Sequence, residues 1–288
     1  MRSIYIDTLG SNLKIHDSTN AVDFWAQTPV DGFDAPDYRI ISYDKPGEDG
    51  MAISSMFYSG RPISIHGVIK GSNPTAFEAN RKLLSTACAI SRDVNGYPLP
   101  KRVSVTTLAG NTFFFDAYFS KPIFAYDQVN WSKYLLQLTA IDPFLYGSQV
   151  SSGAIVRASG GGFILPVILP IVSSSATGGT ATLVNSGNGN SWPIITLTGP
   201  LTNPYINNST IGKFMQLTYT LPLGSTITID MAKKSILLNG SSNLISAKTT
   251  DSTWWPVVAG NNNITFSTGS SADTGNMQIT FYNSYVGI

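Results

Sequence analysis

The sequence is short of charge, of cysteine and of histidine. Charged residues make up 12% of the 288 residues, the formal net charge is +1, and there are one cysteine and two histidines. An average globular protein carries about 25% charged residues. A net charge this close to zero, without a cluster of basic residues, argues against a protein whose main task is to bind the phosphates of nucleic acids. One cysteine excludes an intramolecular disulfide and leaves the redox compartment open.

The charge that is present is unevenly distributed. The first 147 residues hold 13 of the 18 Lys and Arg and 14 of the 17 Asp and Glu. Ser, Thr, Asn and Gly therefore cover much of the remaining surface. The carboxylates of that remainder are Asp230, Asp251 and Asp273, which argues against a catalytic centre there.

Long apolar runs are also lacking. The most apolar stretch, residues 163–172, is broken by Pro166 and Pro170, whereas a bilayer-spanning helix needs about 20 apolar residues. Residues 1–7 are typical of a short strand and lack a secretory apolar core. We therefore expect no membrane insertion, and a protein that is soluble or leaves its cell without a signal peptide.

What is abundant is the signature of β-strands. Most apolar segments are short, β-branched or aromatic, and bounded by Gly, Pro, Asn or Asp. The clearest are Pro62–Ile69, Val103–Thr107, Thr112–Phe119 and Tyr134–Ala140.

One amphipathic helix is predicted at Pro74–Ile90. Asn73 or Thr75 can cap it, and Pro74 suits its first turn. Its spacing places Phe77, Leu84 and Cys88 on one buried face. The residues expected beside that face are Ala76, Leu83, Ala87 and Ile90. The first part of the chain is therefore α+β.

The composition changes after Gly147, where Gly, Ser and Pro become frequent. Regularly spaced short strands without a helical period follow, which indicates a β-sandwich. The strands expected there are Trp192–Thr198, Met215–Leu221, Thr226–Asp230, Ser235–Leu238, Ile264–Phe266 and Met277–Tyr282. Thr226–Asp230 and Ser235–Leu238 are predicted to form a hairpin. We predict a mainly β protein with two domains, residues 1–147 and 148–288.

Reactive groups are scattered rather than clustered. His16, in an expected polar turn, and His66, in a strand, have no second His or Cys nearby in sequence, so the usual ligand spacing of a metal site is missing. Cys88, on the apolar helix face, is expected to be a core residue rather than a nucleophile. The acidic segment 31–37 fails the EF-hand spacing and is interpreted as a turn.

These patterns predict no enzyme, no catalytic residue, no metal and no cofactor. Carboxylates that come together only in the fold keep a glycan hydrolase open as an alternative.

The pair Trp254 and Trp255, followed by Pro256, is the best candidate for a binding feature. In an extended segment the two indoles point to opposite sides. We expect one to be core and the other to lie at a rim or interface, where it could also stack on a sugar.

Several segments, taken in order, resemble the distal tail protein (Dit) family of long-tailed, non-contractile bacteriophages. They are Ala35–Arg39, Tyr43–Gly50, Gly60–Gly67, Leu138–Gly147, Asn185–Asn188, Pro193–Gly199 and Ala259–Ile264. The resemblance implies an N-terminal split β-barrel with one flanking helix and a C-terminal galectin-like β-sandwich.

The resemblance further implies a structural subunit of the virion tail tip, assembled in the host cytoplasm as a homo-hexameric ring. The implied partners are the tail tube protein, the tail-associated protein and a receptor-binding protein, while DNA passes through the channel without specific binding. Structural or assembly positions are expected at Arg39, Arg61, Asp142, Pro143 and Phe144, with Arg61 satisfying carboxylates or carbonyls and Phe144 buried. The alternative function is a carbohydrate-binding adhesin module that uses Trp254 or Trp255.

Overall fold

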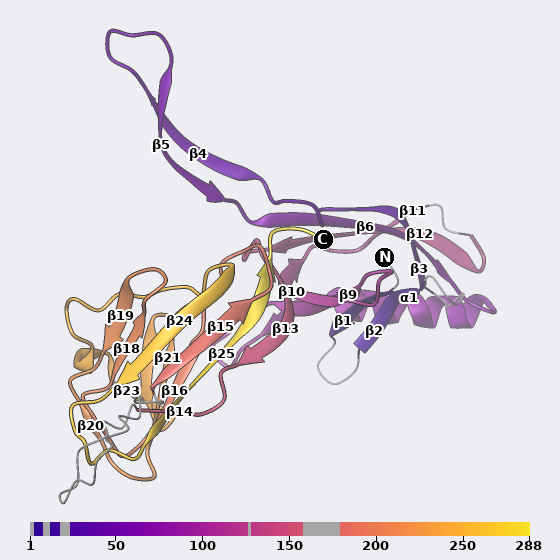
Figure 1. The fold of residues 1–288 in the computed structure, drawn as a ribbon. Helices are drawn as coiled ribbons and strands as arrows, with labels where there is room; N and C mark the ends of the chain where they lie inside the picture. Colours follow the sequence, from indigo (N-terminus) through magenta and orange to yellow (C-terminus); the bar gives the residue numbers. More distant parts are fainter. Residues whose placement is uncertain (1–2, 8–11, 18–23, 126–127, 158–178) are drawn as a thin grey trace, which may run out of the picture. The chain divides into compact units, whose positions relative to one another are not determined.

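Antiparallel strands build most of the computed structural model, which describes residues 3–7, 12–17, 24–125, 128–157 and 179–288 (Figure 1). The prediction of a mainly β protein is confirmed. The chain divides into unit 1, residues 1–147 with 285–288, and unit 2, residues 148–284. The domain assignment 1–147 and 148–288 stays a prediction, and the last four residues cluster with unit 1. The apolar run at 163–172 lies outside the described residues.

The main sheet of unit 1 runs in the order β2-β1-β9-β10-β12-β6-β3. Its strands are β1 (Ser3–Asp7), β2 (Asn12–Asp17), β3 (Phe24–Asp31), β6 (Arg61–Lys70), β9 (Lys101–Thr106), β10 (Thr112–Phe119) and β12 (Trp131–Ala140). The end strands β2 and β3 also contact each other, so the sheet curls back on itself. A split barrel stays a prediction for this arrangement.

The longest pairing in unit 1 joins β6 to β12, from Arg61 opposite Ala140 to Lys70 opposite Trp131. Apolar residues alternate along β6, so Ile63 and Ile65 enter the core. Gly67 leaves room for its partner Tyr134, since a Cβ at Gly67 would lie 2.2 Å from the tyrosine ring. The Tyr134 hydroxyl in turn donates to the Ile15 carbonyl at 3.3 Å, which ties β12 to β2.

The helix α1 (Pro74–Cys88) begins where the sequence predicted. The Asn73 side chain accepts a hydrogen bond from the Ala76 amide at 2.8 Å, so Asn73 is the cap and the Thr75 alternative is wrong. The predicted core face is confirmed, with Phe77, Leu84, Ala87 and Cys88 buried.

Two of the apolar residues that were expected beside that face are exposed. Leu83 is 47% exposed and Ile90 is 67% exposed. Leu83 is rotated about 100° from Leu84 on the helix, and Ile90 lies beyond the helix end at Cys88. The described residues contain no helix with the length and apolar character needed to cross a membrane.

Unit 2 consists of two antiparallel sheets around one apolar core. One sheet runs β14-β25-β16-β21-β22-β23 and the other β15-β24-β18-β19, with β17 and β20 as a separate pair. The strands are β14 (Ile155–Val156), β15 (Thr180–Asn185), β16 (Ile194–Thr198), β17 (Leu201–Thr202), β18 (Tyr205–Asn208), β19 (Lys213–Gln216), β20 (Thr220–Leu221), β21 (Thr226–Asp230), β22 (Ser235–Leu238), β23 (Ser242–Asn243), β24 (Gly260–Ser267) and β25 (Asn276–Tyr285). Strand β13 (Leu145–Ser151) leads from unit 1 into unit 2, and η1 (Ile245–Ala247) is a short 3₁₀ turn. Likeness to galectins stays a prediction.

The predicted hairpin of unit 2 is confirmed by strands β21 and β22. Ile229 lies opposite Ile236, and both side chains are fully buried together with Ile227. The predicted strand 215–221 is instead split into β19 and β20.

The core of unit 1 can be tested by matched truncations. Leu136 is 0% exposed and Leu108 is 76% exposed. We expect Leu136→Ala to lower the free energy of unfolding by about 2–5 kcal/mol, because a buried cavity is created. Leu108→Ala should change it by no more than about 0.5 kcal/mol. Urea denaturation measures both, and equal losses would contradict this core.

Candidate assembly surface

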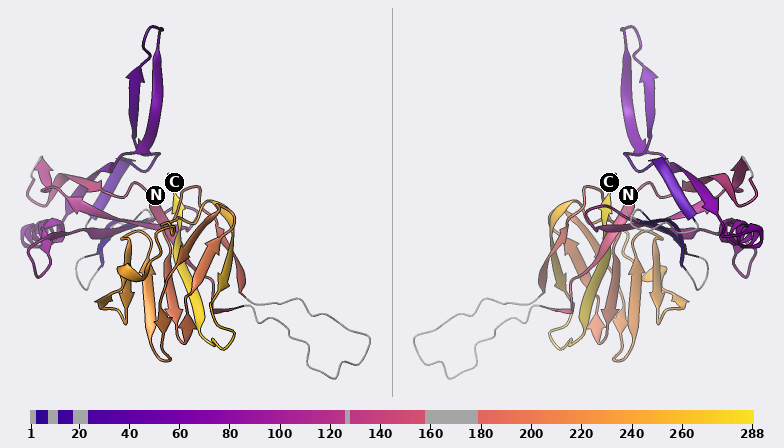
Figure 2. Two further views of the ribbon diagram at one scale, coloured as in Figure 1. Left: turned by 90° about the vertical axis from the view of Figure 1, so that its left-hand side faces the viewer. Right: turned by 90° about the vertical axis from the view of Figure 1, so that its right-hand side faces the viewer.

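A two-stranded hairpin leaves the sheet of unit 1, and we call it the arm (residues 38–58). Its strands are β4 (Tyr38–Asp44) and β5 (Met51–Tyr58), paired from Tyr38 opposite Tyr58 to Asp44 opposite Met51. Pro46 lies in the connecting turn, where Gly47 and Gly50 have φ of 74° and 98°, a region that favours glycine. The arm stands clear of the remainder of unit 1 in each view (Figures 1 and 2).

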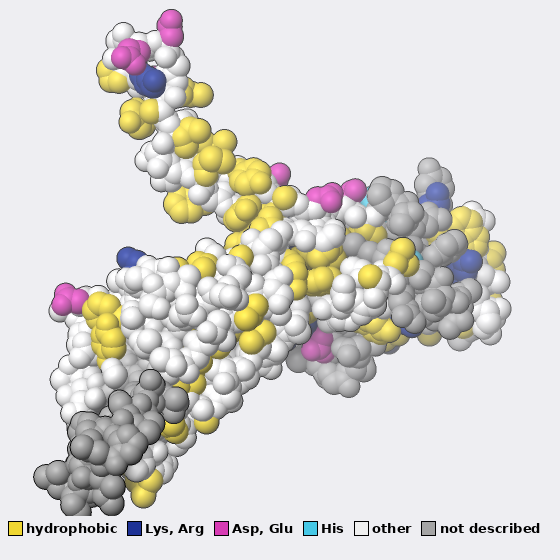
Figure 3. Space-filling view, viewed as in Figure 1, with side chains coloured by type: hydrophobic (Ala, Val, Ile, Leu, Met, Phe, Trp, Pro, Cys, Tyr) yellow, Lys and Arg dark blue, Asp and Glu magenta, His cyan; other side chains and the backbone are white. Residues whose placement is uncertain are grey.

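The arm is apolar although it is exposed. All of β4 and most of β5 are exposed, and their large apolar side chains range from 39% to 66% exposed. These side chains are Tyr38, Ile40, Ile41, Tyr43, Met51, Ile53, Met56, Phe57 and Tyr58. Figure 3 shows apolar side chains in yellow along the arm and a group of acidic and basic side chains at its tip.

Both faces of the arm carry these side chains. Neighbouring residues on a strand point to opposite faces, so Ile40 with its partner Met56 lies on one face and Ile41 on the other. An isolated two-stranded hairpin is at best marginally stable in water, and extended apolar patches usually mark interaction sites. The arm therefore has the properties of a surface that a partner covers.

Arg61 holds the base of the arm. Its side chain is 1% exposed and donates to main-chain carbonyls from three separate segments. The Nη1 atom donates to Gly32 at 2.8 Å and Asp34 at 2.5 Å, Nε and Nη2 donate to Pro143 at 2.9 and 2.6 Å, and Nη2 also donates to Val286 at 2.5 Å. Burial lowers the pKa of Arg61, while the carboxylates of Asp34 and Asp142 raise it.

Segment 31–37, which superficially resembles a calcium loop, thus directs two carbonyls to a guanidinium. Gly32 has φ of 99°, and a Cβ there would approach the Pro62 carbonyl oxygen to 2.3 Å. Only glycine fits this close turn. The segment is a structural connection to the arm.

The turn at residues 142–144 also contacts the base of the arm. The Asp142 carboxylate accepts from the Phe144 amide at 3.1 Å and from the Tyr146 hydroxyl at 2.5 Å. Burial and the adjacent Asp142 carboxylate raise the pKa of Tyr146. Phe144 packs edge-on against Tyr58, with ring centroids 5.6 Å apart, and Tyr58 packs against Tyr38 at 5.4 Å.

Two expectations for this region need adjustment. Phe144 is partly rather than fully buried, because it packs against the exposed arm. Arg39 lies on the arm itself, with its guanidinium 5.6 Å from the centre of the Phe57 ring. The structure thus brings Arg61 together with Pro143 and places Phe144 at the arm's base, while Arg39 is separate from that cluster. Their roles in assembly stay predictions.

The two tryptophans of unit 2 have different environments. Trp255 is fully buried in the core of unit 2, and Trp254 packs against that core while partly buried. The expectation that one indole belongs to the core is confirmed for Trp255, and a rim or interface role of Trp254 stays a prediction. Trp255 as a glycan-stacking residue is wrong, because no part of its ring is accessible.

The dispersed reactive groups do not form a site. His16 is buried in β2 rather than in a turn, and His66 is exposed on β6. Groups of three or more His, Cys, Asp or Glu with metal-binding geometry are absent from the described ranges. Cys88 is 5% exposed, and burial raises the pKa of its thiol to about 11.

Sequence reasoning missed the arm as a surface. Its signal was present, since apolar residues occupy adjacent positions such as Ile40–Ile41 and Met56–Phe57 on both sides of a Pro-Gly turn. Adjacent apolar residues on a strand indicate two apolar faces.

Part of the chain matches a known protein family, and the fold is similar to solved phage structures. Residues 186–285 match the family model described as siphovirus-type tail component, C-terminal domain. The fold is similar to the crystal structure of Dit from phage SPP1, described as a paradigm of hub adsorption apparatus in phages infecting Gram-positive bacteria. The TM-score is 0.66 at 15% identity, with 98% of each chain covered.

The fold is also similar to chains of the phage p2 baseplate in its activated conformation. The TM-score is 0.51 in the structures with Ca and with Sr, at 9% and 10% identity, over 97% of this chain and 98% of the other. No curated protein is detectably similar to the sequence.

Arg61 yields a prediction with a matched control. Arg61→Met leaves buried carbonyls without their donors, so we expect a loss of at least roughly 3 kcal/mol in the free energy of unfolding. Arg39→Met, on the exposed arm, should cost no more than about 1 kcal/mol. Arg61→Lys should retain less than half of the stability that Arg61→Met loses, since an ammonium lacks the forked geometry of a guanidinium. Chemical denaturation compares the three variants, and equal effects of Arg61→Met and Arg39→Met would refute the role of Arg61.

The Cys88 thiol gives a pH-dependent prediction. Its pKa rises from 9.0 to about 11 in the fold. The folded state therefore favours the neutral thiol, and this contribution to stability is complete below pH 9 and disappears as the pH rises to about 11. At pH 8 the thiolate fraction should be about 100-fold below that of the unfolded chain.

Alkylation by iodoacetamide measures this difference without interference, because Cys88 is the single cysteine. We expect the native chain to react at least about 100-fold more slowly than the chain in denaturant. Equal or faster reaction of the native chain would indicate an activated nucleophile instead.

Proposed function

We propose that the chain is a member of the Dit family of siphovirus-type tail components, supported by the family match over residues 186–285 and by the similar fold. In this proposal it is a structural, non-enzymatic subunit of a phage tail tip that assembles into a hexameric ring. The ring joins the tail tube to the tail-associated and receptor-binding proteins. DNA passes through its channel without specific binding, in keeping with a net charge of +1. The subunits assemble in the host cytoplasm and function in the virion.

The arm is the observation that carries this proposal. A ring requires a head-to-tail contact, in which a patch on each copy meets a different patch on the next. The arm supplies one such patch, because apolar side chains occupy both of its faces and its own unit leaves them exposed. The number six comes from the family and not from the arm.

The base of the arm is built to keep its direction. Arg61 fixes Gly32 and Asp34, which precede β4, while Phe144 packs on Tyr58 at the end of β5. Both strands are therefore anchored close to the sheet of unit 1. A hairpin fixed in this way can present its apolar faces to a neighbour without a large loss of conformational entropy on binding.

The alternatives receive less support. In a glycan-binding module Trp255 could not stack on a sugar, since its indole is fully buried. A glycan hydrolase requires a pair of carboxylates, and the second part of the chain contains only Asp230, Asp251 and Asp273. No specific observation favours either activity over assembly.

The oligomeric state tests the proposal. Native mass spectrometry and negative-stain imaging of the purified chain should show rings with six times the mass of the 30.9 kDa chain. Ile40→Asp combined with Met56→Asp charges one face of the arm, and we expect it to abolish rings while circular dichroism stays unchanged.

A control places a single negative charge on an exposed apolar side chain outside the arm. Leu223 is 79% exposed in unit 2, so Leu223→Asp should keep the ring. A chain that stays monomeric, or arm variants that still form complete rings, would overturn the proposed assembly.

A further inference from the structure

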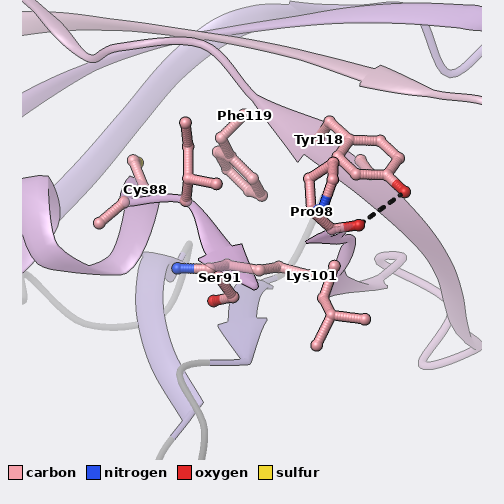
Figure 4. Close-up of a pocket in the computed structure, with 10 residues that line it drawn as sticks. Cys88, Ser91, Pro98, Lys101, Tyr118 and Phe119 are labelled. Carbon is pink, nitrogen blue, oxygen red and sulfur yellow. Dashed lines mark hydrogen bonds between the residues drawn. The ribbon is translucent and has the colours of Figure 1, made fainter. Parts of the chain in front are cut away.

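An open apolar groove lies where α1 ends. The short strands β7 (Ser91–Arg92) and β8 (Pro98–Leu99) pair beside the helix end, and β10 forms the opposite wall. The groove holds about 210 Å³ and is lined mainly by apolar groups, among them Cys88, Ile90, Leu99 and Phe119 (Figure 4).

Two polar groups at this groove, on Lys101 and Tyr118, already have hydrogen-bond partners. The Lys101 ammonium donates to the Ala87 carbonyl at 2.6 Å, and the Tyr118 hydroxyl lies 3.4 Å from the Pro98 carbonyl that it donates to (Figure 4). Sites for drug-sized ligands measure about 300–1,000 Å³, so this groove is too small for such a ligand. Its size and lining suit one or two apolar side chains of a protein.

Exposed apolar side chains extend the groove at its rim. Ile90 is 67% exposed, Tyr97 is 69% exposed and Leu99 is 44% exposed. The rim and the arm are thus two apolar surfaces of unit 1, and each is uncovered within a single chain.

The two surfaces have opposite charge. Residues 74–99, which contain α1 and the groove hairpin, include three basic and two acidic residues, and Lys101 lines the groove. The arm, residues 38–58, includes three acidic and two basic residues. Opposite net charge attracts two patches to each other and repels each from its own kind.

We infer that the groove at the end of α1 receives apolar side chains from the arm of a neighbouring copy. Arm and groove are then the two halves of one head-to-tail contact. This inference rests on the proposed ring and adds to it the surface of the neighbour that the arm occupies. Charge and apolar character together favour a second copy of this chain over a small ligand.

Two complementary variants provide the test. Ile53→Asp damages the arm at a side chain that is 60% exposed, and Leu99→Asp damages the groove at one that is 44% exposed. Each variant alone has one defective half in every possible contact, so neither should form rings. Mixed together, the intact arm of the groove variant can fill the intact groove of the arm variant.

The expected product of the mixture is a 1:1 dimer that does not grow, because its free arm and its free groove are both defective. Native mass spectrometry resolves the dimer if one variant carries a mass label. Ile90→Asp, at a second groove position, should behave as Leu99→Asp does, and circular dichroism verifies that all variants are folded.

The outcomes separate this inference from the proposed function. If the unsubstituted chain forms hexamers and both groove variants still do so, the ring stands and the groove is not its acceptor. If each variant alone is monomeric but the mixture yields no dimer, arm and groove are not partners. An unsubstituted chain that never leaves the monomer overturns the ring and the inference together.

Discussion

The buried guanidinium of Arg61 is the interaction on which the arrangement of unit 1 depends. Removing a charge from water costs several kcal/mol unless hydrogen bonds replace the lost hydration. Here Arg61 donates to carbonyls of Gly32, Asp34, Pro143 and Val286, so that each nitrogen of its guanidinium has an acceptor. These carbonyls belong to the approach to β4, to the turn before β13 and to the C-terminal residues. One side chain therefore connects three segments whose acceptor residues lie outside the strands.

An anchored base permits an arm that lacks a core. The hairpin has cross-strand hydrogen bonds and aromatic contacts such as Tyr38 with Tyr58, but its apolar side chains gain little by burial within their own chain. The hydrophobic stabilisation of the arm is therefore available to an intermolecular contact, at roughly 25 cal/mol for each Å² removed from water. Such an element is suited to assembly and is a liability in an isolated monomer.

Local patterns in the sequence predicted much of this fold, because strands and helices leave local traces. The alternation of apolar and polar residues predicted β6 and the β21–β22 hairpin. Asn73 and Pro74 predicted the start of the helix. The Arg61 cluster could not be predicted in detail, since its acceptors at Pro143 and Val286 lie 82 and 225 residues away. The same limit applies to Leu83 and Ile90, which are apolar but exposed, because their environment depends on what packs beside the helix end.

The near-zero net charge of the chain conceals a division that bears on assembly. Opposite charges within one unit cancel in the total of +1, yet the arm is acidic and the region around α1 is basic. In the proposed head-to-tail contact these regions would face each other, so that attraction would act at every interface without a large net charge on the ring. A like-to-like contact would instead place two acidic arms or two basic helices together. The charge pattern therefore favours the same heterologous pairing as the apolar surfaces, and it does so by an independent physical interaction.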